Sequence, residues 1–173
     1  MELLDHLALG FGVVHPSLSR RTTALVVGGV GAWHLRHDKT NAGARVNALV
    51  VQADGKIVLG GAFTTLQPNG AAATTARTHL ARVESTGALD TAYNPTPNAT
   101  VSALLLQADG QIVVGGSFTS FTPNGATTAT ARNYLARVKT DGTLDTFDPS
   151  ASGAVSTLVP YADGKIIVGG AFN

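Results

Sequence analysis

Residues 46–61 read VNALVVQADGKIVLGG, two apolar runs that flank Ala53-Asp54-Gly55 and end in a glycine pair. The pattern returns as VSALLLQADGQIVVGG at residues 101–116 and as VSTLVPYADGKIIVGG at residues 155–170. The first residues of these stretches lie 55 and 54 positions apart, and residues 46–91 and 101–146 agree at 28 of 46 positions. Self-similarity at a fixed period indicates a repeat architecture. We therefore assign residues 46–100 and 101–154 to two repeats and residues 155–173 to part of a third.

Each full repeat predicts four short strands. The two apolar runs predict a hairpin closed by Asp-Gly, which is typical of a type I′ turn with positive φ at both central residues. Three consecutive leucines in the second repeat indicate a strand buried on both faces. The third and fourth strands are expected at residues 79–83 and 88–91 in the first repeat, and at residues 134–138 and 143–146 in the second.

Four antiparallel strands in about 55 residues, repeated in tandem, are typical of a β-propeller blade. The expected fold is all-β: tandem four-stranded antiparallel blades of a partial, open propeller, about two and a half blades in all. A parallel β-helix is the alternative. Its coils are usually shorter, and Asp-Gly hairpins favour antiparallel pairing.

The glycine pairs Gly60-Gly61, Gly115-Gly116 and Gly169-Gly170 predict a bulge or a close approach of two backbones, because a side chain there would hold neighbours apart. A phosphate-binding loop is the weaker alternative, since no helix and no Lys-Ser/Thr pair follows.

A polar linker follows each glycine pair, at residues 64–78 and 119–133. Each linker contains Pro-Asn-Gly, a turn signal, and then an Ala/Thr-rich stretch that ends at Arg77 or Arg132. The linker is the longest loop of the repeat, so we expect a binding surface there.

The composition excludes several classes of protein. Twelve basic and eleven acidic residues give a net charge of +1, and no basic run appears, so nucleic-acid binding is not expected. The absence of cysteine excludes disulfides and thiolate metal sites. No apolar stretch reaches the roughly 18 residues of a membrane span, and the first residues lack the basic region of a signal peptide.

The acidic and basic residues that recur do not predict an active site. Asp54, Asp109 and Asp163 lie in turns, where turn chemistry accounts for them. The other recurring charges are interpreted as structural partners or solvated side chains: Arg82 and Arg137 on the third strand, Asp90 and Asp145 on the fourth. A residue that serves every blade equally is seldom catalytic, and no calcium-binding D-x-D-x-D-G loop occurs. We predict no catalytic, cofactor-binding or metal-binding residue and no enzymatic activity.

Residues 1–45 do not follow the repeat. They include His6, His15, His34 and His37, and His34-x-x-His37 could form part of a metal site, although no third ligand is apparent. Read one base out of frame, the codons of Trp33 to Asp38 can encode Gly-Thr-Phe-Asp-Thr, which resembles Gly142 to Thr146. Our hypothesis is an irregular leader that is a frame-shifted remnant of a preceding repeat. A genuine leader or an N-terminal cap is the alternative.

The motifs of residues 52–63, 107–118, 80–83, 135–138 and 141–147 resemble the bacterial delta-60 repeat, a β-propeller family of uncharacterised function. Thr86 departs from the family pattern, which has Asp at that turn. The resemblance implies long bacterial proteins, secreted or at the cell surface, with many repeats and no established catalytic residues.

These observations together predict a non-catalytic β-propeller repeat module of an exported bacterial protein, with a structural or interaction role. The alternative is a fragment of a glycan-binding or glycan-processing propeller. The expected partners are the remaining blades of the parent protein and protein or glycan ligands, without nucleic acid. We expect the fragment to be marginally stable or to aggregate when isolated, because open sheet edges and blade faces would be exposed.

Overall fold

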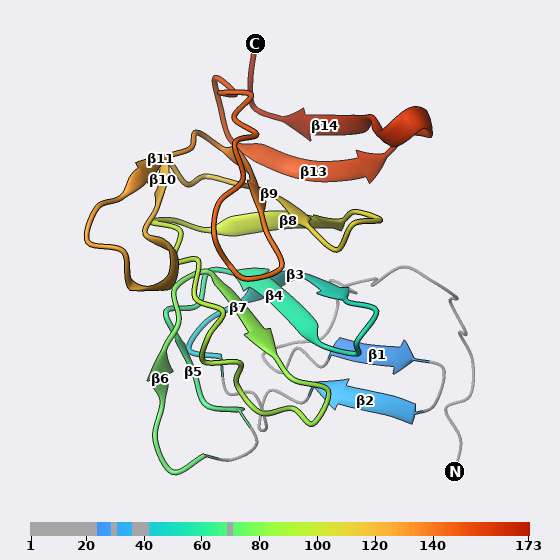
Figure 1. Cartoon of the computed structure of the whole chain (residues 1–173), viewed down its shortest axis with the longest axis vertical. Coiled ribbons are helices and arrows are strands. Elements are labelled where there is room, and N and C mark those ends of the chain that lie inside the picture. Colours follow the sequence, from blue (N-terminus) through green and yellow to red (C-terminus); the bar gives the residue numbers. More distant parts are fainter. Residues whose placement is uncertain (1–23, 29–30, 36–41, 69–70) are drawn as a thin grey trace.

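The computed structural model of the chain describes residues 24–28, 31–35, 42–68 and 71–173, and Figure 1 shows its arrangement. For residues 24–28 and 31–35 the backbone alone is described, as an antiparallel hairpin of β1 (Ala24–Gly28) and β2 (Gly31–Leu35). Residues 42–45 of the leader are also described, and the remainder of the leader lies outside the described residues, His37 among them. The hypotheses of a frame shift and of a histidine metal pair therefore stay predictions.

The first repeat forms a three-stranded antiparallel sheet. Strand β4 (Ile57–Gly61) lies in the middle, between β3 (Val46–Val51) and β7 (Leu80–Val83). All five residues of β4 are buried, as the unbroken apolar run predicts for a strand covered on both faces.

The second repeat reproduces this sheet. Strand β9 (Ile112–Gly116) lies between β8 (Val101–Leu106) and β12 (Leu135–Val138), and all its residues are buried. The three consecutive leucines of β8 are only half-buried, so the burial predicted for them on both faces is incomplete. The third repeat contributes the hairpin of β13 (Val155–Pro160) and β14 (Ile166–Gly170). In Figure 1 the three units follow one another along the long axis of the molecule.

The fourth strand is shorter than predicted. In the described residues it is a single antiparallel bridge in each full repeat, from Val83 to Leu89 and from Val138 to Leu144. The reason lies in the next residue, because the side chains of Asp90 and Asp145 accept hydrogen bonds from the backbone N–H two residues further on. This Asx turn bends the chain away from the sheet.

The Asp-Gly hairpins also differ from the predicted type I′ turn in two of three cases. In the first repeat, Gly55 N–H donates to the Gln52 carbonyl, and Gly55 has φ of 81° while Asp54 is not among the residues with positive φ. The second repeat has the same three-residue loop, with Gly110 at φ of 82°. This geometry is a type I turn followed by a left-handed glycine. Only the third repeat has positive φ at both central residues, 60° at Asp163 and 73° at Gly164.

The linkers contain small ribbons that the sequence did not predict. The first ribbon pairs β5 (Thr65–Leu66) with β6 (Thr75–Ala76), and the second pairs β10 (Ser120–Phe121) with β11 (Thr130–Ala131). The predicted Pro-Asn-Gly turn of the second linker is confirmed as a short 3-10 turn at Pro123–Gly125, in which Asn124 has φ of 50°.

The glycine pairs perform both predicted roles. The pairing register shifts opposite each pair, between Val46 and Ala48 in the first repeat and at the equivalent positions of the others, which marks a bulge. A Cβ on Gly60 would lie 2.5 Å from Val101 Cγ1, and one on Gly115 would lie 2.5 Å from Val155 Cγ1. The first glycine of the first two pairs therefore receives a valine of the next repeat. The second glycine of all three pairs lies against the backbone carbonyl of the residue that precedes the partner strand, which is Arg45, Thr100 or Ala154.

The core lies between the units. The largest buried cluster joins Val58, Leu80 and Tyr93 of the first repeat to residues of the second, among them Val101 and Phe118. Stacked antiparallel sheets with a core at each junction are the arrangement of propeller blades, and the described chain is an all-β, partial propeller. No helix among the described residues is long and apolar enough to span a membrane.

Candidate functional site

The polar side chains of the first repeat converge on Arg82 of β7. Its Nε and Nη2 lie 2.9 Å and 2.8 Å from Asp90 Oδ2, and the side chains are 9% and 7% exposed. The guanidinium also lies over the ring of Tyr93, 4.2 Å from its centroid. Loss of either partner would leave an unpaired buried charge, which strongly destabilises a folded protein.

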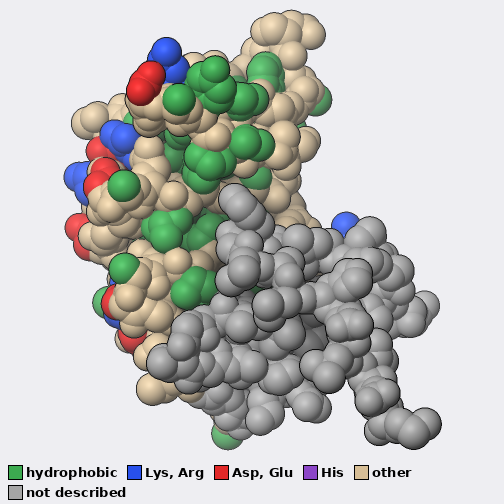
Figure 2. Space-filling model, turned by 90° about the vertical axis from the view of Figure 1, so that its right-hand side faces the viewer, with side chains coloured by type: hydrophobic (Ala, Val, Ile, Leu, Met, Phe, Trp, Pro, Cys, Tyr) green, Lys and Arg blue, Asp and Glu red, His purple; other side chains and the backbone are tan. Residues whose placement is uncertain are grey.

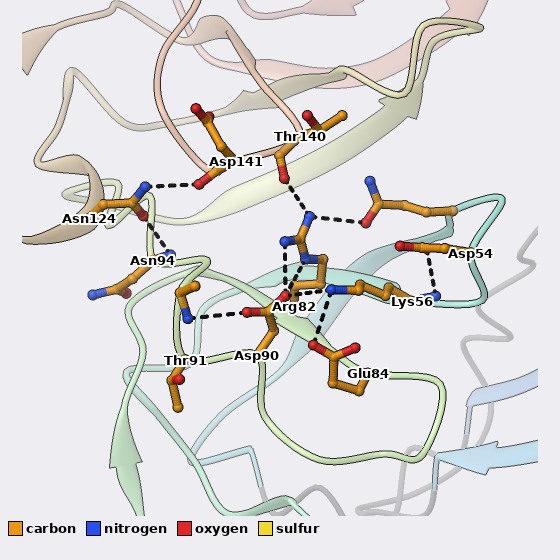
Figure 3. Close-up of polar contacts among 12 residues, drawn as sticks. Asp54, Lys56, Arg82, Glu84, Asp90, Thr91, Asn94, Asn124, Thr140 and Asp141 are labelled. Carbon is orange, nitrogen blue, oxygen red and sulfur yellow. Dashed lines mark hydrogen bonds and ion pairs between the residues drawn. The ribbon is translucent and has the colours of Figure 1, made fainter.

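Lys56 extends this network toward the surface. Its Nζ lies 3.1 Å from both Glu84 Oε1 and Asp90 Oδ2, as Figure 3 shows. Burial alone would raise the pKa of Asp90, but the hydrogen bonds from Lys56 and Arg82 outweigh it and hold the pKa below its usual value. The same bonds to Glu84 and Asp90 raise the pKa of Lys56. Both groups are therefore held in their charged forms.

The network also crosses to the second repeat. Arg82 Nη1 donates to the Thr140 carbonyl at 2.6 Å, as Figure 3 shows, and to Gln52 Oε1 at 3.3 Å. Gln52 Nε2 in turn donates to the Gly110 carbonyl at 3.5 Å, and Asn47 Nδ2 donates to the Val101 carbonyl at 2.9 Å. These contacts fix the position of one sheet on the next.

The second repeat places the equivalent residues alike, but at a more exposed site. Arg137 Nη2 lies 2.6 Å from Asp145 Oδ1, its Nη1 donates to Gln107 Oε1 at 3.4 Å, and its guanidinium lies 5.3 Å from the centroid of Phe147. The hydrogen bond from Arg137 lowers the pKa of Asp145. The interpretation of Arg82 and Arg137 as structural partners is confirmed.

The aspartates of the first two hairpin turns accept hydrogen bonds from their own backbone. Asp54 Oδ1 accepts from Lys56 N–H at 3.1 Å, and Asp109 Oδ1 accepts from Gln111 N–H at 3.0 Å. The second contact lowers the pKa of Asp109. Turn chemistry therefore accounts for these carboxylates, as predicted, and each is engaged within its own hairpin.

Arg77 and Arg132 anchor the two linkers to the sheets. Arg77 is 7% exposed and donates from Nη2 to the Thr91 carbonyl at 3.2 Å, while Arg132 donates from Nη2 to the Asp145 carbonyl at 2.9 Å. Each guanidinium also binds the carbonyl of the residue before it. Both charges are turned inward, so the linkers present no charged side chain on their outer ribbons.

The outer ribbons form the most exposed recurring surface. Residues 71–76 and 124–131 are all exposed and consist of Ala, Thr, Asn and Gly. Asn124 fixes the second ribbon at its base, since its Oδ1 accepts from Asn94 N–H at 2.9 Å and its Nδ2 donates to the Asp141 carbonyl at 2.9 Å (Figure 3). We refer to residues 71–76 and 124–131 as the ribbon surface.

Sequence reasoning missed several of these residues. Gln52 recurs as Gln107, so its recurrence at the repeat period could have indicated a structural role for this glutamine. Lys56 and Glu84 are Gln111 and Lys139 in the second repeat, so no recurrence marks them. Within the described part of the chain, no group of three or more His, Cys, Asp or Glu residues could hold a metal ion.

The family comparison agrees with this arrangement. Residues 52–93 and 107–147 match the model of a family described as a β-propeller domain of unknown function, DUF5122. A comparison with curated proteins finds no match. Among solved structures, the chain is similar to the crystal structure of the WD40 β-propeller domain of Doa1, with 17% identity and a TM-score of 0.40. The similarity covers 86% of this chain and 55% of the other, so the chain spans about half the length of that structure.

Proposed function

We propose that the chain, two stretches of which match the model of a β-propeller family, is a non-catalytic interaction module whose ligand binds the ribbon surface. We further propose that the parent protein is an exported bacterial one, located outside the cell or on its surface. The resemblance to the delta-60 repeat supports this location.

The observation that carries the proposal is a difference between two sets of side chains, the recurring charged residues and the residues of the ribbon surface. The recurring charged residues Arg82, Asp90, Arg137 and Asp145 are engaged with one another in ion pairs. The linker arginines bind backbone carbonyls. The ribbon surface, by contrast, is exposed and uncharged in both repeats. Binding residues commonly lie on loops that a rigid scaffold positions, and this is the arrangement of the ribbons.

The chemistry of the ribbon surface favours a neutral partner. Threonine hydroxyls and the Asn124 region offer hydrogen bonds without charge, so a phosphate-rich or strongly acidic ligand would gain little from them. We propose a protein ligand that pairs through its backbone and neutral side chains. A glycan is the second candidate, because sugar hydroxyls match the same donors and acceptors.

The test uses the full parent protein, in three assays: capture of protein ligands, binding to a glycan array, and hydrolysis of the glycans. We expect binding without turnover. The double variant Thr127→Lys and Thr128→Lys places charge on the ribbon surface and should weaken binding at least tenfold. The matched control is Ala53→Lys with Ala108→Lys, which adds the same charge to exposed hairpin turns at the opposite end of the sheets. Glycan turnover, or equal loss of binding in both double variants, would contradict the proposal.

A further inference from the structure

Arg77 is a buried cation without a paired carboxylate. It is 7% exposed, and its Nη1 and Nη2 donate to two neutral backbone carbonyls. Among the described residues, no ion pair joins Arg77 to an Asp or Glu side chain. Charges elsewhere on the described surface are mixed in sign: Figure 2 shows Lys and Arg side chains beside Asp and Glu side chains along one edge of the molecule. Arg77 departs from this pattern.

The surroundings of Arg77 compensate its charge only in part. Burial lowers the pKa of Arg77, and the charge of Asp90 opposes this effect. The Asp90 carboxylate is itself engaged in ion pairs with Lys56 and Arg82. The Nε of Arg77 is also buried without a hydrogen-bond partner in the described part of the chain, as is that of Arg132. A buried guanidinium with a donor to spare favours the binding of a negatively charged acceptor.

In the second repeat, a carboxylate of the chain itself faces the equivalent arginine. Arg132 occupies the position of Arg77, and its Nη1 likewise donates to the carbonyl of the residue before it. The same Nη1 lies 3.6 Å from Asp148 Oδ2. The Asp148 side chain is 35% exposed, so this carboxylate lies at the surface and in reach of solvent. The second repeat therefore compensates its linker arginine with a residue that follows the fourth strand.

Asn94 takes the place of Asp148 in the first repeat. Each of them directly follows an aromatic residue, Tyr93 or Phe147, whose ring lies against the guanidinium of the third-strand arginine. Each of them also precedes a proline. Asn94 is half-buried and carries a neutral amide. The two repeats thus share the arginine and differ in the charge beside it.

We propose that the first repeat binds a small carboxylate anion at Arg77, beside Asn94. The anion takes the position that the Asp148 carboxylate has in the second repeat and accepts hydrogen bonds from the guanidinium. A guanidinium suits this ligand, because its planar set of donors matches the two oxygens of a carboxylate. The Asn94 amide can donate to the same anion, which an aspartate at this position could not do.

The burial of Arg77 sets the size of the ligand. Because Arg77 is 7% exposed, a bulky anion cannot reach its guanidinium, whereas the place of the Asp148 carboxylate in the second repeat lies at the surface. Neither Arg77 nor Asn94 belongs to the ribbon surface, whose described residues are uncharged. Binding at either place can therefore fail without the other.

The test uses the whole chain, with sodium acetate as the probe at constant ionic strength, and follows the Nε–H signals of Arg77 and Arg132 by NMR. We expect a saturable shift at Arg77 with a dissociation constant on the order of 10 mM, typical of a single charge-assisted contact near solvent. The signal of Arg132 should shift little, because Asp148 competes with acetate there. Sodium chloride is the control salt and should bind at least tenfold more weakly, since a spherical ion cannot accept in a bidentate manner.

Two reciprocal variants exchange the residue beside the arginine. Asn94→Asp gives the first repeat a carboxylate of its own and should weaken acetate binding at Arg77 at least tenfold. Asp148→Asn removes the carboxylate from the second repeat and should produce a saturable acetate shift at Arg132. Unchanged amide exchange at residues 57–61 and 112–116 would verify that each variant is folded.

Four results would overturn the proposal. Equal and non-saturating shifts at both arginines would indicate a general effect of salt. Chloride binding as tight as acetate binding would exclude the carboxylate as the preferred ligand. Acetate binding that persists in folded Asn94→Asp would show that the anion does not take the position of Asp148. If Asn94→Asp does not fold, the reciprocal variant decides, and a folded Asp148→Asn without an acetate response at Arg132 would contradict the proposal.

Discussion

At the scale of single residues, the first glycine of the pairs in β4 and β9 decides how closely two repeats approach. Gly60 lies under Val101, and Gly115 lies under Val155, with no room for a Cβ at either position. Val101 and Val155 are 0% and 1% exposed, so each valine side chain is fully buried at the junction. The packing of one sheet on the next thus depends on the absence of a Cβ at this position. In the sequence, the position is glycine in every repeat.

We predict that Gly60→Ala destabilises the chain by about 2 kcal/mol, as overpacking of a full core does. Val101→Ala removes the side chain that the new methyl group meets and costs about 2 kcal/mol by itself through the cavity it leaves. The double variant should be at least 1 kcal/mol more stable than the sum of the two effects predicts. Urea denaturation of the four proteins measures this coupling. Simple additivity would show that the two residues are not in contact.

At the scale of elements, the same sequence yields different local structures. Ala-Asp-Gly forms a three-residue loop with one positive φ in the first two repeats, and a turn with two in the third. The three hairpins keep the same strand register, so the difference is confined to the loop. The fourth strand is likewise reduced to a bridge by a local Asx turn. Short elements of this kind depend on anchors from outside, and the linker arginines are such anchors.

We predict that Arg77→Met loosens the segment around Thr91, because its carbonyl loses the hydrogen bond from Arg77 Nη2. Amide exchange at residues 88–93 should become faster while residues 57–61 stay protected. The global loss should be about 1–2 kcal/mol, typical of a hydrogen bond to a charged group. Arg132→Met is the matched control, and its effect should appear at residues 143–147 instead. Uniform acceleration across both repeats would contradict the anchoring role.

At the scale of the whole molecule, the described chain is a stack in which each unit contacts its neighbours. The buried clusters lie within and between successive sheets, and the hydrogen bonds of Asn47, Gln52 and Arg82 cross the junction of the first two repeats. Stability in such arrays is a sum of unit terms and junction terms. A change at one junction should therefore affect both adjoining repeats.

We predict that the free energy of unfolding of the chain decreases at acidic pH. Hydrogen bonds hold the pKa values of Asp90, Asp109, Asp141 and Asp145 below their usual range. A group whose pKa is lowered in the folded state stabilises it fully above the unfolded pKa, about 3.9 for Asp, and less as pH falls through the folded value. The midpoint temperature of thermal unfolding should therefore fall as the pH is lowered below about 4. Lys56, whose pKa is raised, acts in the opposite sense and loses its contribution at high pH.

The variant Asp90→Asn tests the contribution of the buried network around Arg82 apart from that of the exposed turns. It should cost about 3 kcal/mol at pH 7, because the Arg82 charge is left without its partner, and the loss should shrink near pH 3. Asp145→Asn is the matched variant at a more exposed pair and should cost less. Equal effects of both variants, or a loss for Asp90→Asn that is the same at both pH values, would show that burial does not set the strength of the pair.

The sequence by itself determined the repeats, the antiparallel pairing, the bulges and the structural role of the recurring charges. Each of these follows from local pattern: continuous apolar runs, a turn signal and a period of 55 residues. The period places the same residue types at the same structural positions in each repeat. The predicted type I′ turn was wrong for the first two repeats and confirmed for the third, and the full fourth strand was wrong for both full repeats. Both predictions depend on loop conformations that several sequences share.

Only the tertiary structure decided which groups meet between repeats. Arg82 and Thr140 lie 58 positions apart, and Lys56 has no counterpart in the second repeat, so no pattern along the chain links them. Their contacts depend on the angle and distance at which one sheet stacks on the next. The same stacking buries Arg82 more deeply than Arg137, two residues in identical sequence motifs, because among the described residues Arg82 donates to a turn carbonyl of the next repeat.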